Sequence, residues 1–85
     1  MAKKQTPLDA LNRAIAIAGS QQELARRVSS LSPERIGQPA ISNWVKRLRR
    51  VPAERVIAVE KAVEGAVKRH ELRPDIYPVS EGRAA

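Results

Sequence analysis

Residues 38–44 read Gln-Pro-Ala-Ile-Ser-Asn-Trp, and this stretch decides the fold. Proline is tolerated only in the first turn of a helix, so Pro39 predicts a helix from about Gln38 to Leu48. Apolar side chains recur at helical spacing along it and predict its buried stripe: Ile41, Trp44, Val45 and Leu48. Trp44 is therefore assigned to the core, not to a base-stacking surface. The outer face is predicted to hold polar or exposed residues: Gln38, Pro39, Ser42 and Asn43.

Two further helices are predicted upstream of this stretch. Thr6 is placed to cap a helix over residues 7–18, and Gly19 supplies a left-handed stop. Ser20 and Glu23 then have the spacing of a capping box, in which each side chain satisfies the other residue's free amide. A second helix is predicted to begin there.

The second helix is expected to turn its apolar side chains inward and its arginines outward. The inward set is Leu24, Ala25 and Val28, and the outward set is Arg26 and Arg27. Residues 29–37 are predicted to be a turn region, in which Ser32 and Pro33 open at most one helical turn that Gly37 ends.

The part of the chain after the basic residues predicts one longer helix and one short turn. Pro52 is expected to begin a helix that runs through Glu64 and ends at Gly65. Residues 68–72 are expected to form one more turn, and residues 75–85 to be extended or frayed. The prediction is an all-α fold of four to five short helices. It comprises a disordered tail over 1–6, a single domain over 7–73 and an extended or frayed tail over 74–85.

Charge is distributed unevenly along the 85 residues. Residues 1–50 contain ten Lys and Arg against three Asp and Glu. Residues 51–85 contain six Lys and Arg against six Asp and Glu, so the net charge of +7 comes from the first fifty residues. We define the basic run as four cations without an interleaved acid: Lys46, Arg47, Arg49 and Arg50. Such an asymmetry favours a polyanionic partner, most often nucleic acid, over the alternative of a merely solvated basic surface.

Two short helices joined by a turn, the second opening with polar side chains and followed by a basic run, form a helix-turn-helix arrangement. The chain has this order in Gln21, Leu24-Ala25, Ile36 and Ile41-Ser42-Asn43-Trp44, followed by Val51-Pro52-Ala53-Glu54-Arg55 and Leu72-Arg73-Pro74-Asp75. Over residues 7–77 it resembles the Cro-type repressors of temperate phages and the YdaS-like antitoxins. The resemblance implies a Cro/lambda-repressor-like helix-turn-helix domain.

The spacing between the two central helices departs from that family. Ala25 and Ile41 lie about six residues further apart than the tight turn of the family allows. The extra residues fall in 29–36, so either the turn is enlarged or the second helix is extended. Both alternatives change what the protein presents beside a DNA backbone.

The resemblance also implies roles for individual residues. Gln38 and Asn43 would reach base edges in the major groove, where an amide offers a donor and an acceptor that match adenine. The further base contacts are Pro39, whose ring suits a thymine methyl, and Ser42. The predicted phosphate contacts are Gln21 and Gln22, beside the free amides of their helix, and the basic run.

The hypothesis from sequence is a regulator of transcription that binds specific double-stranded DNA as a Cro-like repressor at an operator. A homodimer on DNA is one oligomeric state that this hypothesis leaves open. The alternative is an antitoxin-like module that neutralises a toxin partner, with DNA binding secondary. RNA binding is less favoured because the chain has no Phe for base stacking.

Catalysis and membrane association find little support in the sequence. His70 is the only histidine, there is no cysteine, and no Gly-rich phosphate loop is present, so we expect neither an enzyme nor a cofactor or metal. The longest apolar run, residues 14–18, is far shorter than a membrane span. We expect a cytoplasmic bacterial protein, associated with the nucleoid when bound to DNA.

Overall fold

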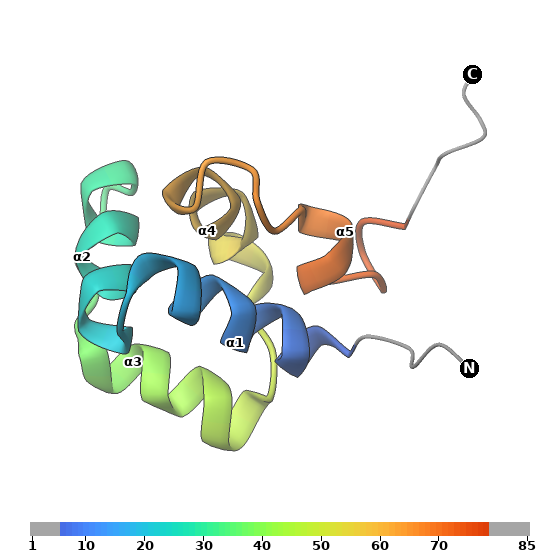
Figure 1. The fold of residues 1–85 in the computed structure, drawn as a ribbon, viewed down its shortest axis with the longest axis horizontal. Coiled ribbons are helices and arrows are strands. Elements are labelled where there is room, and N and C mark those ends of the chain that lie inside the picture. The colour runs from blue at the N-terminus through green and yellow to red at the C-terminus, as the bar shows by residue number, and fades with distance from the viewer. Residues whose placement is uncertain (1–5, 79–85) are drawn as a thin grey trace.

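The computed structural model describes residues 6–78, and every regular element in this range is a helix (Figure 1). The elements are α1 (Pro7–Ala18), α2 (Gln21–Leu31), α3 (Gln38–Asn43), η1 (Trp44–Leu48), η2 (Ala53–Arg55), α4 (Val56–Ala62) and α5 (Arg69–Leu72). η1 is a π-helical continuation of α3, and η2 is a 3-10 turn that leads into α4. The prediction of an all-α helix-turn-helix domain is confirmed.

Side-chain caps set the starts of the first two helices. The Thr6 hydroxyl accepts from the Asp9 amide at 3.1 Å, and the Asp9 carboxylate accepts from the Thr6 amide at 3.3 Å. Gly19 ends α1 in the left-handed region, with φ 113°. At α2 only half of the expected capping box forms. The Ser20 hydroxyl accepts from the Glu23 amide, but the Glu23 carboxylate bonds to arginines instead.

α2 packs against α1, α3 and α4, and the core lies where these helices meet (Figure 1). Its largest fully buried side chains are Leu11, Leu24, Val28, Ile41, Val51, Val56, Val59, Val67 and Leu72. Trp44 is 4% exposed and belongs to the same cluster, as predicted. Because α3 is anchored through Ile41 and Trp44, its opposite face is held toward solvent.

The predicted buried stripe of the 38–48 helix was wrong at its end. Leu48 is 42% exposed, and Val45 is only partly buried. The cause is the change to π-helical bonding at Trp44, because i→i+5 hydrogen bonds shift the residues that follow around the helix axis. Leu48 therefore leaves the face that Ile41 and Trp44 share.

Arg27 and the turn after α2 also differ from expectation. Arg27 does not point away from the core, since its guanidinium donates to the Ala62 carbonyl of α4 at 3.3 Å. The six additional residues are divided between two places: α2 extends to Leu31, and residues 32–37 form a loop without the expected helical turn. Both alternatives left open by the spacing therefore hold in part.

The C-terminal part departs from the expectation of an extended tail. α4 ends at Ala62, before the predicted Glu64. The amides of Ile76 and Tyr77 both donate to the Arg73 carbonyl, and Tyr77 packs partly against the core. This segment is a folded turn. The remainder of the two predicted tails, residues 1–5 and 79–85, lies outside the described residues.

Candidate nucleic-acid interface

α3 presents its predicted base-contacting residues to solvent. Gln38, Pro39 and Asn43 are exposed, and Ser42 is half-buried. Gly37 precedes the helix in extended conformation, and Pro39 lies in its first turn, where no backbone donor is lost. An exposed amide at each end of a short helix can offer hydrogen-bond donors and acceptors to a base edge.

A side-chain bond joins the starts of α2 and α3. The Gln38 amide nitrogen donates to the Gln21 amide oxygen at 2.6 Å. Gln21 is half-buried and Gln22 is exposed beside it. The Gln38 amide keeps its oxygen and a second N–H for another partner, because an amide carries two donors and one acceptor group. Gln21 therefore orients Gln38 in addition to lying at the predicted phosphate site.

The basic run follows directly in η1 and the connector after it. All four side chains are exposed, and among residues 6–78 Lys46, Arg47 and Arg49 form no ion pair. The Arg50 guanidinium lies 4.0 Å from the Asp75 carboxylate. Arg49 ends the helix in the left-handed region, with φ 58° and ψ 29°, and its amide donates to the Trp44 carbonyl.

An arginine that was given no role from sequence braces this connector. The Arg73 guanidinium donates to the Val51 carbonyl at 3.0 Å and to both oxygens of the Asp75 carboxylate at 3.0 and 2.7 Å. The bonds between Arg73 and Asp75 lower the pKa of Asp75 to about 2 and raise that of Arg73. Arg73 thereby fixes the chain just after the basic run. The Leu-Arg-Pro-Asp motif could have predicted this pairing, since its Arg and Asp are only two residues apart.

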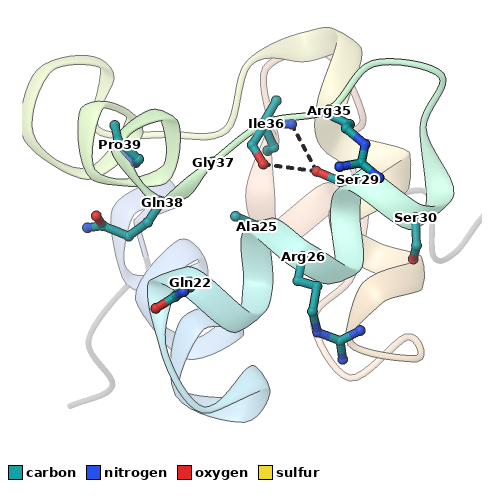
Figure 2. Close-up of a pocket in the computed structure, with 10 residues that line it drawn as sticks. All are labelled: Gln22, Ala25, Arg26, Ser29, Ser30, Arg35, Ile36, Gly37, Gln38 and Pro39. Atoms are coloured by element: carbon teal, nitrogen blue, oxygen red, sulfur yellow. Dashed lines mark hydrogen bonds between the residues drawn. The ribbon is translucent and has the colours of Figure 1, made fainter.

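The enlarged turn forms one wall of a groove of about 670 Å³, and α2 forms the other (Figure 2). The Ser29 hydroxyl donates to the Ile36 carbonyl and accepts from the Ile36 amide, each at 2.9 Å. Ile36 packs against the core, whereas Arg35 beside it is exposed. The groove continues to Gln38 and Pro39, so it adjoins the predicted base contacts. Sequence reasoning left Arg35 unassigned because its position depends on this loop.

Comparison with known proteins places these features in a family. The profile of the family described as "Bacterial toxin YdaS" matches residues 11–81. The chain is 39% identical over 64 residues to the "Putative transcriptional regulator YdaS" of Escherichia coli (strain K12), which covers 75% of this chain and 59% of that protein. The chain thus matches less than two thirds of its relative's length. No solved structure matches.

Proposed function

This chain belongs to the YdaS family, and we propose that it regulates transcription by binding specific double-stranded DNA, as a Cro-like repressor at an operator. The observation that carries the proposal is the set of side chains exposed along one continuous helix, formed by α3 and η1. Gln38 and Asn43 expose amide side chains in its first six residues. Its last turn and the connector expose four cations, of which Lys46, Arg47 and Arg49 form no ion pair in the described part of the chain. Amides suit base edges, and unpaired cations suit phosphates.

The two chemistries serve different parts of binding. Gln38, Pro39, Ser42 and Asn43 would read base pairs in the major groove. The basic run, with Gln21 and Gln22 at the start of α2, would hold the backbone and set the orientation of the helix. The printed name of the Escherichia coli relative, which describes a transcriptional regulator, supports the same function.

Selection of random duplexes for binding tests the proposal. We expect recovery of a defined site, retained in mobility-shift assays against excess nonspecific DNA. A site with two-fold symmetry and half-sites about one helical turn apart would indicate a homodimer on DNA. Recovery of no common sequence, with affinity equal on all duplexes, would contradict sequence-specific regulation.

A second candidate function is interaction with a protein of a toxin–antitoxin pair, with DNA binding secondary. The description of the matched family as a bacterial toxin supports a place in such a pair, on the toxin side and not on the antitoxin side that the sequence alternative named. Expression of the chain in bacteria with and without its neighbouring genes separates the two. A growth defect or a rescue that persists in a variant unable to bind DNA would favour the protein-interaction role.

A further inference from the structure

The enlarged turn places a cation beside the base-reading end of α3. Arg35 is exposed and forms no ion pair among residues 6–78. Its backbone is nevertheless held, because its neighbour Ile36 is bonded at both its amide and its carbonyl to Ser29 of α2. The side chain is therefore carried by a fixed loop, and it costs less to order on a ligand than one on a loose loop.

The opposite wall of the groove is a strip along the outer side of α2. Gln22, Ala25, Arg26, Ser29 and Ser30 line it, and Figure 2 shows Arg26 on this wall and Arg35 on the loop wall. The lining of the whole groove holds two arginines and no acidic residue, and four of its other residues carry amides or hydroxyls. The Ser29 and Ser30 hydroxyls donate to backbone carbonyls, so the groups that can donate to an anionic ligand are the two arginines and the amides of Gln22 and Gln38.

The two arginines differ in how much charge they offer. Arg26 is 70% exposed, but its guanidinium bonds to the Glu23 carboxylate at 2.5 and 3.0 Å. That bond, with a second from Arg27, lowers the pKa of Glu23 to about 2, so the carboxylate stays charged and offsets Arg26. Arg35 is paired with no carboxylate among residues 6–78, so it is the principal cation of the groove.

We propose that this groove binds a phosphodiester of the DNA backbone flanking the base pairs read by α3, with Arg35 as the main contact and Arg26 and Gln22 beside it. The inference rests on the proposed DNA-binding function and extends it. The groove adjoins Gln38 and Pro39, so a strand whose bases face α3 passes its mouth. The enlarged turn then adds a backbone contact that a tight turn could not supply.

The salt dependence of Arg35→Ala tests the assignment. The probe is a duplex of about 30 base pairs, roughly three helical turns, with the selected site at its centre. Each phosphate contact contributes about 0.9 to the slope of log affinity against log salt. We expect the variant to lose that amount of slope, which corresponds to about an eightfold weaker affinity at about 0.1 M salt.

Three matched variants sharpen the test. Arg35→Lys should keep the slope, since a phosphate accepts either cation, and Arg26→Ala should lose less than Arg35→Ala. Lys61→Ala removes an exposed cation from α4, outside the groove, and should leave the slope unchanged. Thermal melting of each variant checks that the fold is kept. When the duplex is shortened from its ends, the loss of affinity caused by Arg35→Ala should disappear before the loss caused by Asn43→Ala.

The outcomes separate this inference from the function on which it rests. Wild-type protein that binds its selected site while Arg35→Ala keeps the full slope would overturn the groove assignment and leave the proposed function standing. If Arg35→Ala keeps the full salt slope but no longer binds a protein that the wild type binds, the groove would be assigned to that protein instead. Wild-type protein that binds no duplex would overturn both.

Discussion

The segment from Lys46 to Arg50 and the segment from Arg69 to Asp75 are both rich in arginine, but they use it differently. In the later segment Arg69 bonds to Glu60 at 2.8 Å and Arg73 bonds to Asp75 at 2.7 Å. In the earlier one, Lys46, Arg47 and Arg49 meet no acid among residues 6–78. The comparison teaches that arginine content alone does not give the cations available to a partner, because the two arginines of the later segment are already paired with acids.

The largest expected effect tests what both segments depend on, the core. Trp44→Ala should lower the free energy of unfolding by about 3 to 5 kcal/mol, because it empties a buried site the size of an indole. That is much of the total for a small domain. Urea denaturation measures it. Leu48→Ala, four residues along but exposed, is the control and should change stability by less than about 0.5 kcal/mol.

Removing the brace should destabilise the fold less than emptying the core. Arg73→Ala deletes the charge-assisted bond to the Val51 carbonyl as well as the pair with Asp75, so we expect a loss of about 1.5 to 3 kcal/mol. Arg69→Ala breaks a more exposed pair and should cost about 0 to 1 kcal/mol. Equal losses in the two variants, measured by urea denaturation, would show that the Val51 contact adds nothing.

Base reading by the residues that precede the earlier segment should be visible as lost specificity for the selected site. Asn43→Ala should cost about 1 to 3 kcal/mol of binding on the selected site and almost nothing on random duplex. Gln38→Ala should relax a neighbouring base position. Binding titrations on single-base variants of the site locate both effects. Equal weakening on every duplex would instead mean that these amides hold phosphate.

The basic run should contribute through charge alone. Arg47→Ala should make the salt slope shallower by about 0.9 and weaken binding to all sequences alike. Arg69→Ala, whose charge is already paired with Glu60, should leave the slope as it is. Titrations at several salt concentrations compare the two. An identical slope change would erase the distinction between free and paired arginines.

The smallest expected effect is on acid stability. Asp75 has a pKa of about 2 in the fold against 3.8 without its partners, so its contribution is present above pH 3.8 and is lost as pH falls toward 2. Wild-type protein should therefore lose melting temperature faster across that window than Asp75→Asn, which cannot titrate at this position. Parallel loss in the two proteins would exclude Asp75 as a contributor.

Local signals predicted the starts of the first three helices and the buried residues of α2 and α3 well, but not the start of α4, which begins at Val56 after a 3-10 turn and not at Pro52. Thr6, Ser20, Gly19 and Pro39 act within a few residues of themselves, so their effects are readable from the chain. The placement of Trp44 followed from spacing for the same reason. The exposure of the candidate base contacts was predicted in this way, whereas their roles remain predictions.

The features that were missed depend on contacts between distant parts of the chain. Arg27 reaches a carbonyl 35 residues away, and Arg73 reaches one 22 residues away. No local pattern distinguishes these arginines from solvated ones. The loop conformation that places Arg35 similarly depends on Ser29 and Ile36 meeting across seven residues. The π-helical turn at Trp44 had no marker that we recognised in the sequence.

Arg49 adopts a left-handed backbone conformation, which affects the residues that evolution can select at this position. Gly19 and Gly65 occupy positive φ where a side chain would be strained, but at the end of the 38–48 helix the same region is occupied by a cation. A non-glycine residue there costs on the order of 1 kcal/mol. Glycine at 49 would relieve that strain and delete a charge from the basic run. A lineage selected only for thermal stability should therefore drift toward glycine at this position. A lineage that must keep binding a polyanion should retain the cation.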